Sequence, residues 1–186
     1  VFSKYERTGG RGLSLLMETT MSPTVIRLIS DMKTRLPFMT VYRYDPLNDD
    51  NLRSALFSVS GRRVVPQYDY RDADVVVSLE HDFLAQSANS LVSSKSFADR
   101  RDPESSAMNR LYVFESNYSL TGAQADHRFR VWSSQIPIVL LQLVRALVSQ
   151  GVSSLSGSVN NLYDTLKSPF VVPQSVVDEM AKDLIR

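Results

Sequence analysis

The chain has 186 residues, of which 43% are hydrophobic and 22% are charged, as in ordinary globular proteins, which excludes a disordered chain or a coiled coil. Because it contains no cysteine, it can form no disulfide and can hold no zinc ion or iron–sulfur cluster through thiolates. Its 21 basic and 20 acidic residues leave a net charge of +1, which gives no field for attracting nucleic acid. The longest apolar stretch, 136–148, is shorter than the roughly 20 residues that cross a bilayer. We therefore expect a soluble domain without direct membrane insertion.

A strand and a helix are predicted first. A short apolar run at 13–17 follows a polar, glycine-rich leader and predicts a strand. Ser22 then offers an N-cap, and Pro23 fits the first helical position, where its missing N–H costs nothing. Apolar residues at helical spacing continue this helix to Leu36.

Three further strands and a helix follow. The aromatic and β-branched run 38–44 predicts a strand, and a helix is expected from 48 to a C-terminal glycine at 61. The runs 75–79 and 111–114 are almost continuously apolar, as in strands that are buried on both faces. The polar segment between them, 86–108, is a loop or a short helix with a loop.

The last third of the chain is predicted to be mainly helical. A short extended segment at 129–132 precedes a buried apolar helix at 136–149. A flexible connector rich in serine and glycine follows at 151–161. The final helix is predicted to start with a capping box formed by Ser175 and Asp178.

Alternating strands and helices predict an α/β protein with a doubly wound, Rossmann-like, mostly parallel sheet, helices on both faces and additional C-terminal helices. We expect residues 1–150 to form this domain. Residues 151–186 would be the connector and a C-terminal helix, which packs on the same domain or leads into the next.

Ligands of parallel sheets bind in the crevice outside the carboxyl ends of the strands. Four polar segments are predicted to line this edge, at 18–20, at 45–46, at 80–83, and at 115–116 with the loop that continues to 128. We expect none of their residues to be catalytic or to bind a cofactor. The candidate crevice residues are Thr19, Thr20, Asp45, Glu80, His81, Asp82, Glu115, Ser116, Thr121, Gly122, Asp126, His127 and Arg128.

Three kinds of chemistry could use this edge. A metal could be held by the two histidines together with nearby carboxylates. The histidines, however, do not have the spacing of a known metal-binding motif, which favours the alternative that the carboxylates pair with arginines or loop N–H groups. We therefore expect no metal. A serine hydrolase would need a G-x-S-x-G turn, which is absent from the sequence. The glycines at 9, 10 and 12 precede the first strand instead of following it, unlike those of a dinucleotide site.

Arginines and one tryptophan give further expectations. Salt bridges are favoured over a phosphate site for the arginines at 100, 101, 110, 128 and 130. Asp126 and Arg128 lie two residues apart, so we expect them to contact each other and to fix their loop against 80–83. Trp132 is expected in the core.

The loop sequences between residues 9 and 131 resemble one family. The motifs that carry the resemblance are Gly10-x-Gly12-Leu13-x-Leu15-Leu16-x-Glu18, Ser22-Pro23-Thr24, Tyr44-Asp45-Pro46, Ala73-Asp74-Val75-Val76-Val77-Ser78-Leu79, Asp82-Phe83-Leu84, Phe97-Ala98-x-Arg100-Arg101, Met108-Asn109-Arg110-Leu111-Tyr112-Val113-x-Glu115-Ser116 and Thr121-Gly122-Ala123-x-Ala125-Asp126-His127-Arg128. Together they look like the molybdopterin-oxidoreductase-like subunit of the alternative complex III group. The members of this group are quinol-oxidising respiratory assemblies of bacteria.

This resemblance implies an internal α/β domain of a longer oxidoreductase subunit. It implies iron–sulfur clusters elsewhere in that subunit, partner domains and subunits in a membrane-attached complex, and a location at the periplasmic face of the inner membrane. Where active molybdopterin enzymes have a Gly-x-Asn-Pro-type loop, this chain has Glu80-His81-Asp82-Phe83, whose carboxylates would repel the pterin phosphates. We therefore expect a non-catalytic scaffold without molybdopterin. The alternatives are an active molybdopterin enzyme and a small-molecule-binding α/β domain without a redox role.

Overall fold

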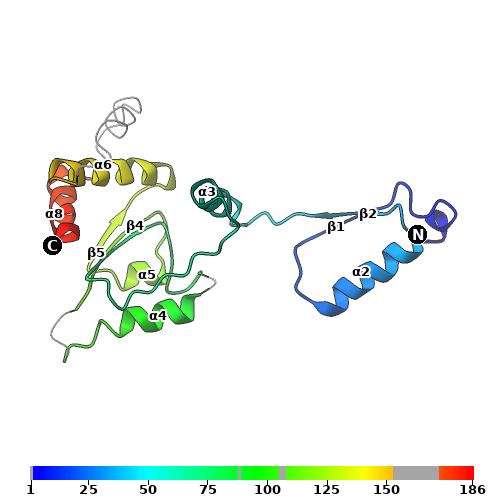
Figure 1. Cartoon of the computed structure of the whole chain (residues 1–186), viewed down its shortest axis with the longest axis horizontal. Helices are drawn as coiled ribbons and strands as arrows, with labels where there is room; N and C mark the ends of the chain where they lie inside the picture. Colours follow the sequence, from blue (N-terminus) through cyan, green and yellow to red (C-terminus); the bar gives the residue numbers. More distant parts are fainter. Residues whose placement is uncertain (1, 88, 105–107, 153–171) are drawn as a thin grey trace. The chain divides into compact units, whose positions relative to one another are not determined.

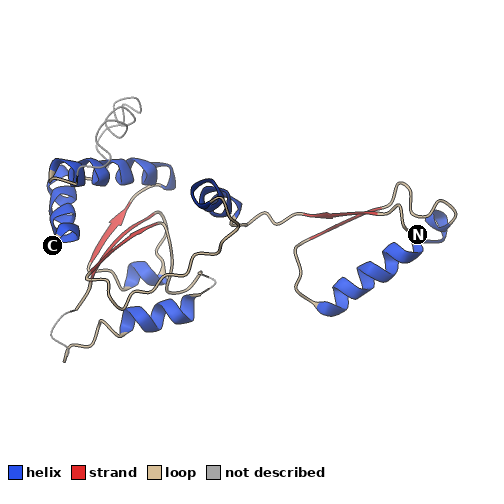
Figure 2. Ribbon diagram, in the orientation of Figure 1, coloured by secondary structure: helices blue, strands red, loops and turns tan. Residues whose placement is uncertain are grey.

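The computed structural model describes residues 2–87, 89–104, 108–152 and 172–186. The chain divides into two compact units, residues 1–65 and residues 66–186 (Figure 1). Each unit has a small parallel sheet flanked by helices, so the predicted α/β class is confirmed (Figure 2). The strands form two sheets instead of one continuous sheet. Apolar runs predict which segments become strands. Which strands then pair with each other depends on tertiary contacts between distant segments, and a single run does not reveal these contacts.

Residues 1–65 contain a two-stranded parallel sheet in which Leu16 lies opposite Tyr42. One helix, α2, runs along this sheet (Figure 1). The predicted glycine-rich leader contains a one-turn helix, α1, that the sequence pattern does not reveal. The elements of this unit are α1 (Phe2–Glu6), β1 (Ser14–Met17), α2 (Pro23–Arg35), β2 (Thr40–Arg43) and α3 (Asp50–Ser60).

The predicted start of α2 and the predicted end of α3 are confirmed, whereas α3 starts at Asp50, two residues later than predicted. The Ser22 hydroxyl accepts a hydrogen bond from the Val25 N–H at 3.5 Å, and Pro23 is the first residue of α2. Helix α3 ends at Gly61, whose φ of +67° lies in the left-handed region that glycine adopts without strain. Gly10 also has a positive φ, of +88°, and a Cβ there would in addition lie only 2.9 Å from the Leu36 Cβ.

Residues 66–186 contain a three-stranded parallel sheet in the order β3-β4-β5. Helices α4 and α5 follow β3 and β4, and α6 packs against α8. The elements of this unit are β3 (Val75–Leu79), α4 (Ser90–Ala98), β4 (Arg110–Glu115), α5 (Leu120–Ala123), β5 (His127–Arg130), η1 (Ser133–Gln135), α6 (Ile136–Ser149) and α8 (Gln174–Ile185).

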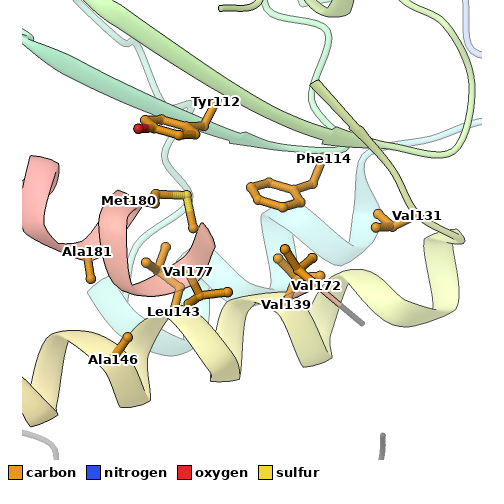
Figure 3. Close-up of a cluster of buried hydrophobic side chains, with 10 residues drawn as sticks. All are labelled: Tyr112, Phe114, Val131, Val139, Leu143, Ala146, Val172, Val177, Met180 and Ala181. Atoms are coloured by element: carbon orange, nitrogen blue, oxygen red, sulfur yellow. The ribbon is translucent and has the colours of Figure 1, made fainter. Parts of the chain in front are cut away.

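Successive residues of the central strand β4 face two different cores. Leu111 and Val113 pack in a cluster with Phe83 and Phe97, on the side of α4. Tyr112 and Phe114 belong to the cluster with residues of α6 and α8, shown in Figure 3. Because both faces are covered by apolar side chains, β4 is buried from Leu111 to Glu115.

Two local predictions in this unit are wrong. Trp132 is 72% exposed, because the chain leaves the sheet after Arg130 and only Val131 of the next two residues points into the core. Helix α8 starts at Gln174, directly after Pro173, so Ser175 lies within the first turn and forms no capping box. The Gln174 side chain instead donates to Asp178 at 2.8 Å.

Three further expectations concern the C-terminal part. Helix α6 has the predicted bounds, whereas the connector predicted at 151–161 lies, apart from residues 151 and 152, outside the described residues. The boundary expected at residue 150 therefore stays a prediction. No helix in the described part of the chain combines the length and the apolar character needed to cross a membrane.

Candidate functional site at the carboxyl edges of the sheets

The candidate crevice residues fall into two groups, one in each unit. In residues 1–65, the Asp45 carboxylate accepts hydrogen bonds from the Thr19 N–H at 2.8 Å and from the Thr19 hydroxyl. These bonds lower the pKa of Asp45. The Thr20 hydroxyl accepts from the Ser22 N–H at 3.2 Å and so shapes the turn before α2. Asp45 and Thr19 therefore tie together the chain segments that follow β1 and β2.

Thr19 and Asp45 border a hollow of about 520 Å³ at the carboxyl ends of β1 and β2. This volume is within the range that small ligands occupy, roughly 300–1,000 Å³. The lining carries both charge signs, with two arginines and three aspartates. Its residues are Thr19, Arg43, Tyr44, Asp45, Leu47, Asn48, Asp49, Asp50 and Arg53.

In the second unit, Glu80 follows β3 and holds the ends of all three strands. Its carboxylate accepts hydrogen bonds from the hydroxyl of Ser116, after β4, and from that of Ser133, after β5, the latter at 2.6 Å. Partial desolvation of this carboxylate would by itself raise the pKa of Glu80, but the hydroxyl donors outweigh this effect and lower the pKa. Glu80 therefore stays anionic at neutral pH.

Asp82 connects the loop after β3 to helix α5. Its carboxylate accepts from the Thr121 N–H at 3.0 Å and from the Thr121 hydroxyl at 2.7 Å. The same hydroxyl accepts from the Leu84 N–H at 3.1 Å. Because Thr121 is fully buried, this network fixes the two loops to each other.

Glu115, the last residue of β4, is a buried carboxylate with several donors. Arg128 donates from Nε at 2.5 Å, and the Ser119 hydroxyl donates at 2.5 Å. Gly122 lies directly against this carboxylate, since a Cβ there would be 1.9 Å from the Glu115 Oε1. The Arg128 guanidinium also lies over the Tyr118 ring, 4.5 Å from its centroid. Gly122 is therefore needed for this close approach and not for a ligand turn.

Asp126 and His127 lie at the opposite edge, which corrects their predicted place in the crevice. Strand β5 begins at His127, two residues earlier than predicted, so Asp126 precedes the strand. Asp126 accepts two hydrogen bonds from Arg101, at 2.9 and 2.6 Å, and one from the Leu111 N–H at 2.7 Å. Burial would raise the pKa of Asp126, but Arg101 and the Leu111 N–H lower it.

The predicted Asp126–Arg128 contact is therefore wrong. Each of the two residues has another partner, Arg101 for Asp126 and Glu115 for Arg128. The salt-bridge interpretation of the arginines is confirmed for Arg101 and Arg128 and for two further pairs, Arg100–Asp74 and Arg110–Asp183.

The two histidines do not come together. His81 follows β3 and its ring lies edge-on to Tyr68, with centroids 6.1 Å apart. His127 begins β5 and stacks on Tyr112, with centroids 4.7 Å apart. Among the described residues, no three histidine or carboxylate side chains gather in a way that could hold a metal ion. The described residues therefore do not have the arrangement that a metal site combining His81 with His127 would need.

Sequence reasoning misses three residues of these networks. Ser133 bonds Glu80 across 53 residues of chain, and no local pattern marks this contact. Ser119 has a detectable signal, because it caps α5 by accepting from the Gly122 N–H at 2.9 Å. Asn109, which accepts from Arg101 at 2.6 Å, belongs to one of the motifs quoted above.

A comparison of the chain with protein-family models found no match, and neither did a comparison with curated protein sequences. The resemblance to the molybdopterin-oxidoreductase-like subunits therefore rests on the quoted motifs alone.

Proposed function

We propose that this chain is a non-catalytic, molybdopterin-oxidoreductase-like scaffold domain of a respiratory, quinol-oxidising iron–sulfur complex. One observation supports the non-catalytic part of this proposal. Three carboxylates at the carboxyl edge of the second sheet are already hydrogen-bonded within the chain. Glu80, Asp82 and Glu115 each accept hydrogen bonds from donors of this chain. A catalytic acid or base must reach a substrate proton, whereas these groups hold loops in place.

The same edge is poorly suited to a pterin cofactor. Phosphate groups are normally bound by backbone N–H groups in a glycine-containing turn or by arginine and lysine. Here Glu80 and Asp82 place negative charge in the first loop, and Arg128 is already paired with Glu115. Like charges about 4 Å apart repel by roughly 4 kcal/mol at an effective dielectric constant of 20. We therefore propose that molybdopterin does not bind.

The scaffold role is supported by the apolar surface of residues 1–65. Leu16 and Tyr42 lie opposite each other on β1 and β2, and both are more than half exposed. Parallel sheets are almost always covered on both faces, so this face suits another polypeptide as a cover. We propose that the cover belongs to another domain or subunit of the complex. Iron–sulfur clusters elsewhere in the longer chain and a periplasmic location complete the proposal and rest on the resemblance.

The test uses the full-length parent protein, purified from a host that makes molybdopterin. We expect iron and co-purifying complex subunits, but no stoichiometric molybdenum or pterin by elemental analysis and mass spectrometry. A parallel preparation from a host strain that lacks the cofactor pathway is the control, and it should assemble equally well. Pterin retained at near one equivalent would overturn the scaffold proposal in favour of an active molybdopterin enzyme.

A small-molecule-binding domain without a redox role is the second candidate. The hollow at the carboxyl ends of β1 and β2 favours it, because both its position and its volume of about 520 Å³ suit a ligand. The same purification separates the two candidates. A parent protein without iron and without partner subunits, but with a bound small molecule, would support this candidate over the scaffold.

A further inference from the structure

Glu80 has a backbone conformation that normally belongs to glycine. Its φ is +51°, and among the described residues no other non-glycine residue has a positive φ. The position is fixed, because the Glu80 N–H donates to the Phe114 carbonyl at 2.7 Å. A side chain in this region carries strain that glycine avoids. A glutamate here therefore indicates that the carboxylate supplies an interaction that a glycine could not.

That interaction joins three strand ends at one oxygen atom. The hydroxyls of Ser116 and Ser133 both donate to the Glu80 Oε1, and the two hydroxyl oxygens are 3.1 Å apart. Ser116 follows β4, Ser133 follows β5 and Glu80 follows β3, at the edge where parallel sheets bind ligands. Glu80 and Ser133 are exposed and Ser116 is half-buried, so small ions in solution can reach this point.

We propose that Ser116 and Ser133 form an anion-binding site that the chain's own Glu80 occupies. Two hydroxyl donors converging on one anionic oxygen are an arrangement suited to a carboxylate or phosphate group. Because Glu80 is attached to the same chain, its effective concentration at the site is high, and a free anion competes poorly with it. The carboxyl edge is thus closed to anionic ligands by an internal acceptor as well as by charge repulsion.

This inference rests on the proposed scaffold function and deepens it, since it names the group that closes the edge. The two can fail separately. Pterin in the full-length protein would overturn the scaffold, whereas the occupied site is tested on the 186-residue chain with simple anions.

The experiment compares the wild type with Glu80→Gly, which removes the carboxylate and leaves a residue suited to the positive φ. Melting is followed in sodium formate and in sodium chloride at equal ionic strength. In chloride, Glu80→Gly should melt lower than the wild type. Formate should then raise its melting temperature saturably by about 2–4 °C, with no such rise in the wild type. Inorganic phosphate, the second probe, should act in the same way.

The double variant Glu80→Gly/Ser133→Ala is the matched control, because it lacks one of the two donors and should not respond to formate. Glu80→Asn is tested alongside, since asparagine tolerates the left-handed region and keeps the test open if the glycine variant does not fold. Fluorescence of Trp132, the single tryptophan and the neighbour of Ser133, gives a second readout of binding. The proposal is overturned if neither variant responds to formate more than the wild type, or if the double variant responds equally.

Discussion

Leu16 in β1 and Leu111 in β4 both lie in parallel strands, yet Leu16 is 69% exposed and Leu111 is 0% exposed. The apolar runs around them look alike in the sequence. The difference lies in what covers each sheet. Strand β4 has strands on both sides and apolar clusters on both faces, whereas β1 pairs with β2 alone. An apolar run therefore predicts a parallel strand, but not whether both faces of that strand are covered within its own unit.

The same contrast extends to the helices. Helices α2 and α3 have apolar residues at helical spacing but contain no buried residue, whereas α6 and α8 each bury several. Among the described residues of 1–65, the buried apolar side chains are those of Leu36 and Met39. A two-stranded sheet with so small a core has little stability of its own. Substitutions should therefore cost much more in residues 66–186 than in residues 1–65.

The largest expected difference is between Leu111→Ala and Leu16→Ala. Removing the fully buried Leu111 side chain should lower the free energy of unfolding by about 3–4 kcal/mol, through lost burial and a residual cavity. The same change at the exposed Leu16 should alter it by less than about 0.5 kcal/mol. Urea denaturation followed by far-UV circular dichroism, which reports the helices and strands of both units, measures both values. Equal costs at the two positions would mean that the contrast in burial is wrong.

Gly122→Ala should destabilise residues 66–186 by about 3 kcal/mol, because the new Cβ would lie 1.9 Å from the Glu115 Oε1 and push a buried carboxylate away from Arg128. Gly61→Ala is the matched control. Gly61 has a positive φ, but a Cβ at this position would meet no atom within 4 Å, so only the backbone strain of about 1 kcal/mol applies there. Thermal and urea unfolding of both variants compare the two costs. A Gly122→Ala variant as stable as the wild type would show that the loop moves freely.

How far the sequence predicts this molecule depends on whether a feature is local. The Ser22 cap, the Gly61 end of α3 and the runs of β3 and β4 are local signals, and the sequence predicts them. Helices α1 and α5 are too short to show a helical period, so the sequence does not predict them. Strand β5 begins with the polar residues His127 and Arg128, so its apolar pattern is recognisable only from Phe129 onward.

The candidate site shows the same limit. Thr19 with Asp45, and Glu80 with Ser116, are predicted to share an edge because each residue follows a strand. Asp126 is assigned to that edge only because the sequence pattern misplaces the start of β5. Hydrogen-bond partners between distant segments are determined by tertiary packing, which a single sequence pattern does not encode.

Asp126→Ala should cost about 2 kcal/mol, because it removes two hydrogen bonds to Arg101 and one to the Leu111 N–H at a partly buried position. The exposed pair Asp69–Arg71 provides the control, and Asp69→Ala should leave the free energy of unfolding almost unchanged. Urea denaturation of both variants is the measurement. A loss as small as that of the control would mean that Asp126 is effectively solvated.

The contribution of Asp126 should also disappear in acid. Although burial raises the pKa of Asp126, Arg101 and the Leu111 N–H lower it below the ordinary value of 3.8. A carboxyl group with a lowered pKa in the folded state stabilises above its unfolded pKa and loses this effect as the pH falls through its folded pKa. The stability difference between the wild type and Asp126→Ala should therefore be constant down to about pH 5 and shrink below about pH 4. Urea titrations across this range test it, and a difference that persists undiminished in acid would contradict the assignment.

The smallest expected effect concerns the attachment of α8 to β4. The Tyr112 hydroxyl donates to Asp183 at 2.6 Å, and Arg110 contacts the same carboxylate. Tyr112→Phe removes one hydrogen bond but keeps the ring in the apolar core, so it should cost about 1 kcal/mol. Tyr118→Phe is the control, because the Tyr118 ring is exposed and keeps its contact with the Arg128 guanidinium without the hydroxyl.

Hydrogen exchange should show faster opening of 174–185 in Tyr112→Phe, while β4 stays protected. Faster exchange in β4 as well would mean that α8 and the sheet open together, so that the well-packed unit unfolds as a single cooperative body.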